Sequence, residues 1–201
     1  SVYNACHLID AKATIVKDPN DLKNFNRVIL PGVGAYKDAM EHLIQTGMNE
    51  AVYEYAKSGK PMIGICLGMQ LSIIEFARNV LGIEDANSIE FDPDTKNPLI
   101  YLIDSFIDQS GNKQLRTHES PMGGTMRLGE YPFEPLKGTN LQKAYGNEEI
   151  YHERHRHRYE ANPKYKEALE KAGMIISGQS DGLIEAVELK DHPWFVGGQF
   201  H

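Results

Sequence analysis

A cysteine between two glycines is the part of the sequence best suited to chemistry. Gly64 lies in the apolar run 62–65, and Cys66 and Gly68 come between that run and a helical pattern over 71–80. A strand, a sharp turn and a helix make a nucleophile elbow, which presents a reactive side chain at the end of a sheet. The N-terminal end of the helix would face the sulfur and lower the pKa of the thiol. A buried, inert thiol is the alternative that this stretch alone leaves open.

His201 is the second candidate, because it follows the last apolar run, residues 194–200. A strand over that run would deliver the imidazole to an edge of the sheet. A thiol nucleophile needs a base, and a histidine distant in sequence often supplies it once the chain has folded. We therefore predict that Cys66 and His201 form a catalytic pair of nucleophile and base.

A glycine-rich turn, Pro31–Gly34, follows the apolar run 27–30. Backbone N–H groups in such a turn can face a developing negative charge. The N–H of Leu67, directly after the cysteine, has the same potential. The pattern indicates an oxyanion site made by Leu67 with Val33 and Gly34, although a plain strand-to-helix turn remains an alternative.

The elements around these residues alternate between strand and helix. The apolar patterns predict strands over 13–16, 27–30 and 62–65, and helices over 36–45, 50–57 and 71–80. This alternation favours an α/β fold with a parallel sheet covered by helices on both faces. Ligands of such sheets bind at the carboxyl ends of the strands, where Gly32 and Cys66 fall.

The remaining segments are less regular. A helix is expected over 1–10, with Cys6 on its apolar face, and an exposed loop over 108–120. Later strands are expected over 99–103, 174–178 and 183–189, the last two joined by a hairpin turn at Asp181-Gly182.

Histidine and arginine alternate between His152 and Arg158. A metal site is disfavoured here, because the arginines would repel a cation and no cysteine or carboxylate cluster has metal-ligand spacing. Alternating arginines on one strand face suit an anion or carboxylate clamp. A solvated basic edge strand explains the pattern equally well.

The composition is that of one ordinary globular domain. The chain has 201 residues, 41% of them hydrophobic and 24% charged, and a net charge of −7, which disfavours nucleic acid and anionic membranes as partners. Nothing approaches the ~18 consecutive apolar residues of a membrane span. Two cysteines do not make a disulfide framework, so we expect a reducing compartment such as the cytoplasm.

Taken together, Pro31–Gly34, Gly64–Gln70 and Gln199–His201 resemble the main motifs of class I glutamine amidotransferase domains. The resemblance implies a three-layer α/β sandwich with a mostly parallel central sheet. From the elbow onward the chain resembles the glutaminase domain of CTP synthase, whereas residues before Leu71 resemble the glutaminase subunit of imidazole glycerol phosphate synthase. The sequence is thus a mosaic of two branches. The stretches that match CTP synthase are 74–79, 86–88, 123–129, 153–160 and 192–196.

The resemblance assigns roles to single residues. Cys66 would attack the side-chain amide of glutamine to give a thioester and ammonia, and His201 would act first as base and then as acid. Glu90 would hold the α-amino group of glutamine and Arg158 its α-carboxylate. The residues expected to bind glutamine are Gly32, Gln70, Glu90, Arg158 and Tyr159.

The resemblance also implies a partner that uses the ammonia. No nucleotide-binding fingerprint occurs in this chain, so no cofactor is expected in this domain. ATP, UTP and Mg are expected on a synthetase domain of the CTP synthase type. A cyclase that makes imidazole glycerol phosphate is the alternative partner.

The family continues its last motif with proline and glutamate after the histidine, whereas this sequence ends at His201. We interpret residues 1–201 as one amidotransferase domain truncated at both ends, and we expect low activity from it alone. Two rivals stay open: an α/β-hydrolase with a cysteine elbow, and a scaffold domain that keeps the fold without turnover.

Overall fold

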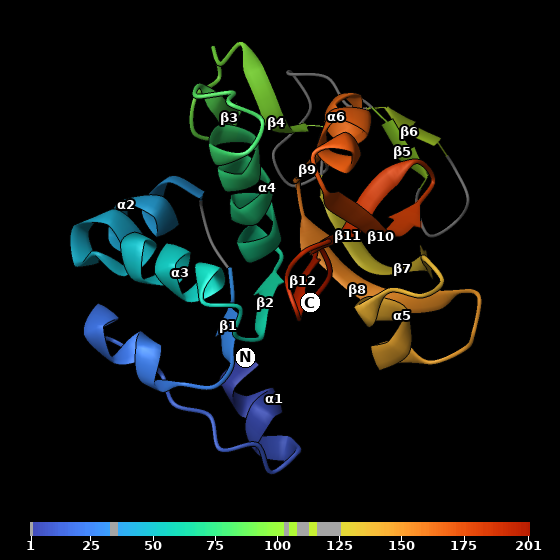
Figure 1. The fold of residues 1–201 in the computed structure, drawn as a ribbon. Helices are drawn as coiled ribbons and strands as arrows, with labels where there is room; N and C mark the ends of the chain where they lie inside the picture. Colours follow the sequence, from blue (N-terminus) through green and yellow to red (C-terminus); the bar gives the residue numbers. More distant parts are fainter. Residues whose placement is uncertain (1, 33–35, 103–104, 108–112, 116–125) are drawn as a thin grey trace.

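The structure is a computed structural model that describes residues 2–32, 36–102, 105–107, 113–115 and 126–201 (Figure 1). Among these residues no helix combines the length and the apolar character needed to cross a bilayer.

A seven-stranded sheet forms the centre of the fold, in the order β1-β2-β12-β11-β10-β7-β8 (Figure 1). The first three of these strands pair in parallel, as expected for the segments that carry the glycine-rich turn and the elbow. The other pairs are antiparallel, so the sheet is mixed. The α/β class is confirmed. The strands are β1 (Val28–Leu30), β2 (Met62–Ile65), β7 (Arg127–Pro135), β8 (Tyr151–His157), β10 (Met174–Ser180), β11 (Leu183–Leu189) and β12 (Phe195–Gly198).

The antiparallel part of the sheet includes the predicted hairpin. β10 and β11 are joined through Asp181 and Gly182, whose φ angles are 47° and 81°. Positive φ at both positions gives the turn the twist that adjacent strands need.

Helix α4 (Leu67–Asn79) is the central helix of the fold. It packs against β2 and β12, and also against two outer strands, β3 (Ala86–Ser88) and β4 (Asn97–Leu102). Most of its side chains are buried, which explains why the apolar residues of this segment are not confined to one stripe. The other helices are α1 (Val2–Leu8), α2 (Tyr36–Thr46), α3 (Met48–Lys57), α5 (Asn140–Tyr145) and α6 (Lys166–Lys171), with 3₁₀ turns η1 (Pro19–Asn24) and η3 (Pro163–Tyr165).

Two small sheets complete the described part. β9 (Tyr159–Ala161) pairs with β4, which also pairs with β3. β5 (Ser105–Ile107) pairs with β6 (Lys113–Leu115). The predicted loop over 108–120 is therefore wrong at 113–115, and the rest of it lies outside the described residues.

Two expectations for the first residues are wrong. Residues 13–16 form no strand, because this run of β-formers pairs with no strand of the described sheets. Helix α1 is present but contains no buried residue, so Cys6 is only partly covered and does not join the core.

An aromatic cluster supports the chain just before His201. Phe200 stacks on Phe133 of β7, with ring centroids 4.8 Å apart, and Tyr145 of α5 meets Phe133 edge-on at 5.2 Å. Aromatic pairs of this kind add to the free energy gained from burial. The cluster therefore anchors the segment that leaves β12 and carries His201.

Candidate active site

Cys66 lies at the junction of β2 and α4 and has the strained backbone of an elbow. Its φ is 53° and its ψ is −106°, a region that L-residues seldom occupy. The N–H of Cys66 donates to the carbonyl of Gly198 at 2.6 Å, and its carbonyl accepts from the N–H of Gln70 at 3.1 Å. These bonds fasten the nucleophile to both β12 and the first turn of α4.

Small residues let three backbone segments approach each other at the elbow. A Cβ on Gly68 would collide with the carbonyl oxygen of Leu30, at the end of β1. A Cβ on Gly32 would collide with the side chain of Leu67. The glycine-rich turn therefore begins in contact with Leu67, whose N–H is expected to stabilise an oxyanion. Val33 and Gly34, the other expected donors, lie outside the described residues.

A pocket of about 460 Å³ opens beside the elbow. It brings together Cys66 and His201, and the expected glutamine-binding residues lie on the same wall. Sequence reasoning missed Met126, Arg156 and His157. The pocket is lined by Gly32, Cys66, Leu67, Gln70, Glu90, Met126, Arg156, His157, Arg158, Tyr159 and His201.

The surroundings of the sulfur disfavour its ionised form. Burial, together with the carboxylates of Glu160 and Glu90, raises the pKa of the Cys66 thiol to about 11. The N–H of Leu67 and the amide of Gln199 act in the opposite direction. The expected lowering of this pKa is therefore wrong, because burial outweighs the helix N-terminus. In the ligand-free protein the thiol holds its proton at neutral pH.

His201 is placed to take a proton. The backbone N–H of His201 donates to the carbonyl of Arg154 at 2.9 Å, which ties this residue to β8. Partial burial and the electrostatic influence of His157, Arg154 and Arg156 lower the pKa of His201. The imidazole is therefore neutral at neutral pH, the state that a base requires.

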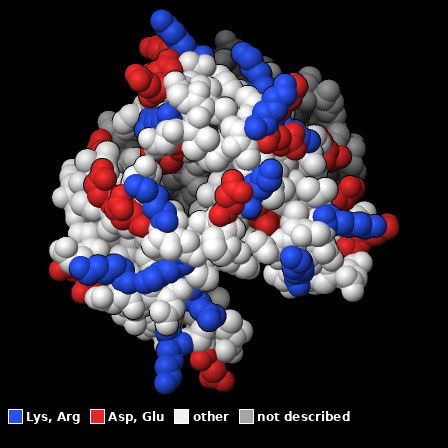
Figure 2. All heavy atoms as spheres, in the orientation of Figure 1, with Lys and Arg blue, Asp and Glu red and all other residues white. Residues whose placement is uncertain are grey.

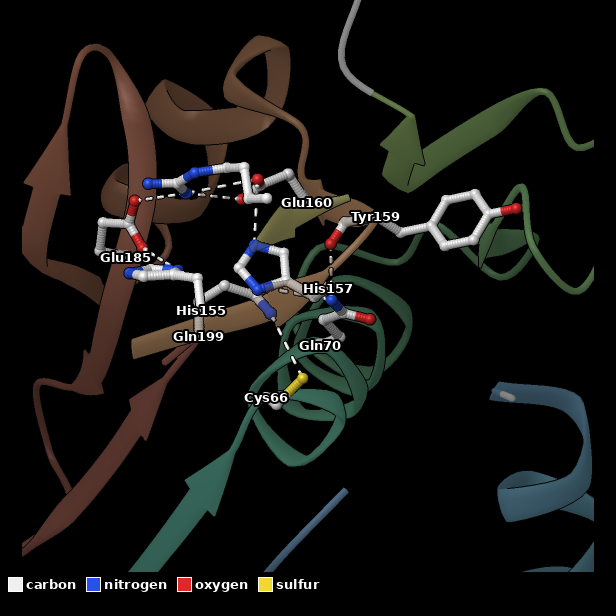
Figure 3. Close-up of polar contacts among 9 residues, drawn as sticks. Cys66, Gln70, His155, His157, Tyr159, Glu160, Glu185 and Gln199 are labelled. Carbon is white, nitrogen blue, oxygen red and sulfur yellow. Dashed lines mark hydrogen bonds and ion pairs between the residues drawn. The ribbon is translucent and has the colours of Figure 1, made fainter. Parts of the chain in front are cut away.

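Gln70 is oriented by contacts from two directions. Its Nε2 donates to the carbonyl of Tyr159 at 2.9 Å and to Oε1 of Gln199 at 3.1 Å (Figure 3). The ring of Tyr159 extends away from Cys66 in this view, so Tyr159 acts on the site through its backbone (Figure 3). Gln199 is fully buried, and Nε2 of its amide lies 3.6 Å from Sγ of Cys66.

A buried cluster of charged residues lies next to Gln199 (Figure 3). Arg127 contacts Glu185 at 2.7 Å and Glu160 at 3.3 Å. Nε2 of His157 lies 3.0 Å from Glu160, and Nδ1 of His155 lies 3.7 Å from Glu185. These residues come from β7, β8, β9 and β11, so the cluster joins four strands behind the pocket.

Burial sets different charge states within this cluster. Burial alone would raise the pKa of Glu160, but His157 and Arg127 lower it to about 2. Burial raises the pKa of Glu185 to about 7 despite its contact with Arg127. Burial, with Arg127 and His157 nearby, lowers the pKa of His155 to about 2. At neutral pH the cluster thus holds ionised Arg127 and Glu160 beside a neutral His155.

The alternation of histidine and arginine reflects the two sides of β8. His155 and His157 are buried, whereas Arg154 and Arg156 are exposed. Arg156 reaches the pocket wall, so the strand serves both as a solvated edge and as a source of positive charge for the site. Among the described residues no group of histidine, cysteine and carboxylates is placed to hold a metal ion.

Comparison with known proteins identifies the class to which this fold and site belong. The family of class I glutamine amidotransferases matches residues 2–201, and the chain belongs to this family.

Among its curated relatives are CTP synthases. That of Sulfurimonas denitrificans is 69% identical over 149 residues, which make up 74% of this chain and 28% of that protein. That of Wolinella succinogenes is 65% identical over 156 residues, or 77% of this chain and 28% of that protein. The chain thus spans little more than a quarter of the length of these relatives. The matches favour the CTP synthase branch over imidazole glycerol phosphate synthase and argue against an α/β-hydrolase.

Solved structures support the same assignment. The glutaminase domain of Trypanosoma brucei CTPS, solved with bound acivicin, superposes with a TM-score of 0.66 at 30% identity, covering 91% of this chain and 65% of that one. A glutamine amidotransferase of Thermotoga maritima has a TM-score of 0.56 at 13% identity, covering all of this chain and 68% of that one, and shows the shared fold alone. The predicted amidotransferase-like fold is confirmed.

Proposed function

We propose that this chain hydrolyses L-glutamine to glutamate and ammonia through a thioester on Cys66. The observation that carries the proposal is the shared pocket: a chain of the amidotransferase family places Cys66, His201 and an oppositely charged pair, Glu90 and Arg158, on one wall. A nucleophile, a base and a site for an amino acid are the parts that this reaction needs.

The reaction begins with a protonated thiol. Sγ attacks the amide carbon of glutamine while neutral His201 takes the thiol proton, and that proton then leaves with the amine as ammonia. Water next attacks the thioester, which releases glutamate and restores the thiol. The N–H of Leu67 already points at the sulfur and stabilises the oxyanion of both steps, with Val33 and Gly34 as further proposed donors.

Recognition of glutamine rests on complementary charge. Glu90 accepts hydrogen bonds from the α-amino group, and Arg158 donates to the α-carboxylate. Each residue carries the charge opposite to that of the group it binds. Gly32, Gln70 and Tyr159 shape the rest of the pocket. Arg156 adds positive charge that favours an anionic substrate group, and His157 lies next to it in the pocket lining.

The ammonia is proposed to serve a synthetase that converts UTP to CTP, as in the CTP synthases that resemble this chain. ATP, UTP and Mg would bind to that synthetase, and this domain would need no cofactor. On the face shown in Figure 2, the described Lys and Arg residues are interspersed with Asp and Glu and form no continuous basic surface for nucleic acid. The cytoplasm, where nucleotides are made, is the proposed location.

The proposal is tested by the release of ammonia from glutamine. We expect Cys66→Ser to reduce the release by at least about 10³-fold, as loss of a covalent nucleophile does. Cys6→Ser is the matched control, because Cys6 is the other cysteine and lies in α1, outside the pocket lining. Equal rates for the Cys66→Ser variant and the unsubstituted chain would overturn the proposal, and so would a folded chain that releases no ammonia.

A further inference from the structure

Gln199 is a fully buried residue that sequence reasoning gave no separate role. It follows the last residue of β12, and its backbone N–H donates to the carbonyl of Glu185 on β11 at 2.8 Å. The carbonyl of the preceding residue, Gly198, accepts the N–H of Cys66. One short segment therefore holds the main chain of the nucleophile and also brings an amide side chain to its sulfur.

The neighbours of Gln199 define which way its amide points. The carbonyl of Tyr159 can only accept, so the group of Gln70 that faces it is the NH₂. The same NH₂ reaches Gln199, which must therefore present its oxygen to Gln70. The remaining group of Gln199, its own NH₂, is left to face Sγ of Cys66 at 3.6 Å (Figure 3).

The result is a directed chain of hydrogen bonds from the backbone of β9, through Gln70 and Gln199, to the sulfur of Cys66. Gln70 lies on the pocket wall, whereas Gln199 is buried behind it. An N–H donor favours an anionic sulfur over a neutral thiol, because the bond strengthens as negative charge develops.

We propose that Gln199 is a positioning residue for the nucleophile, which donates a hydrogen bond to the Cys66 sulfur and links that sulfur to the substrate-binding Gln70. Only the catalytic importance of this hydrogen bond rests on the proposed function. Its effect on the thiol exists whether or not glutamine is the substrate.

Other charges also face the sulfur and set the background for this effect. Glu160 and Glu90 oppose the thiolate, and the N–H of Leu67 favours it. The arginines of the pocket wall are Arg156 and Arg158, and His157 and His201 lie beside them. A change at Gln199 leaves these groups in place, so a shift in thiol titration reports on the Gln199 amide.

The test measures the rate at which iodoacetamide alkylates Cys66 as a function of pH, read by mass spectrometry of the peptide that contains it. Gln199→Leu removes the donor to sulfur and the acceptor for Gln70. Gln199→Met keeps a similar length without a branch or a charge and also removes the donor. We expect both variants to move the titration midpoint upward by about one pH unit, or to slow alkylation about tenfold at a fixed pH below the midpoint.

Gln179→Leu is the matched control, since Gln179 lies on β10 and bonds to Lys166 at 2.6 Å outside the pocket lining. The peptide with Cys6 is an internal reference for the reagent. Near-ultraviolet circular dichroism verifies that each variant is folded, and if Gln199→Leu does not fold, the uncharged Gln199→Met decides. An unchanged midpoint in the folded variants would overturn the inference. A shifted midpoint in a protein without glutaminase activity would keep the inference and remove the proposed function.

Discussion

The residues of the pocket determine whether the proton of the Cys66 thiol stays on sulfur or passes to His201. Cys66 is protonated at rest because burial and two carboxylates disfavour its charge, while His201 is neutral and can accept. A protonated thiol is protected from adventitious electrophiles, since the thiolate is the reactive form. Reaction then depends on a substrate that brings the amide carbon, the sulfur and His201 together.

Glu90 is predicted to act on the thiol and on the substrate in opposite ways. Glu90→Gln removes a negative charge that raises the pKa of Cys66, so alkylation by iodoacetamide at pH 8 should become a few times faster. The same change removes the proposed partner of the α-amino group, so KM for glutamine should rise by about tenfold or more. Glu84→Gln is the control, because Glu84 is exposed and lies outside the pocket lining. Slower alkylation in Glu90→Gln would contradict this account.

At the scale of elements, the local features of the site could be predicted from the sequence. The spacing of Gly64, Cys66 and Gly68 encodes the elbow locally, and the structure shows the strand, turn and helix that it predicts. The pKa of Cys66 was predicted with the wrong sign, because burial depends on tertiary packing that no local pattern contains. The run 13–16 was predicted as a strand, but β-propensity makes a strand only where a partner strand exists.

The buried charge cluster was also missed, for a different reason. Arg127, Glu160 and Glu185 are far apart in the sequence, and charged residues are expected on the surface. Only the approach of β7, β9 and β11 reveals that they neutralise one another.

Arg127 is predicted to hold these strands together. Arg127→Leu leaves Glu160 and Glu185 buried without their cation, and we expect a loss of about 3–5 kcal/mol in the free energy of unfolding by urea. Lys171→Leu is the control, because the pair of Lys171 with Glu167 is exposed, and its loss should change the free energy by less than about 1 kcal/mol. Similar losses in the two variants would show that the buried cluster has no special part in stability.

For the whole molecule, the buried titratable groups predict how stability depends on pH. The pKa of His155 is lowered to about 2, so its contribution is present above its unfolded value of 6.5 and is lost as the pH falls. The pKa of Glu185 is raised to about 7, so its contribution is present at low pH and is lost as the pH rises through 7. Between the unfolded values of 4.5 and 6.5 these two trends oppose each other.

Below pH 4.5 the two trends no longer cancel. Glu160, like His155, has a pKa lowered to about 2 in the folded state, so both groups bind protons more readily in the unfolded chain. We therefore expect the free energy of unfolding to be nearly flat from pH 6.5 to 4.5 and to fall by up to about 3 kcal/mol per pH unit below that. Urea titrations across this range provide the measurement. Glu160→Gln should make the acid slope shallower, and a stability that rises on acidification below pH 4.5 would refute the assignment of charges.

The most direct test of the central claim is covalent labelling of the chain by a diazo-ketone analogue of glutamine, located by mass spectrometry. The account predicts one label, on Cys66, that is prevented by excess glutamine and absent from Cys66→Ala, while Cys6 stays unmodified. Such a result would demonstrate that nucleophile and amino-acid pocket act together. Labelling that glutamine does not prevent, or a folded chain that takes no label, would contradict the assignment of this pocket to glutamine.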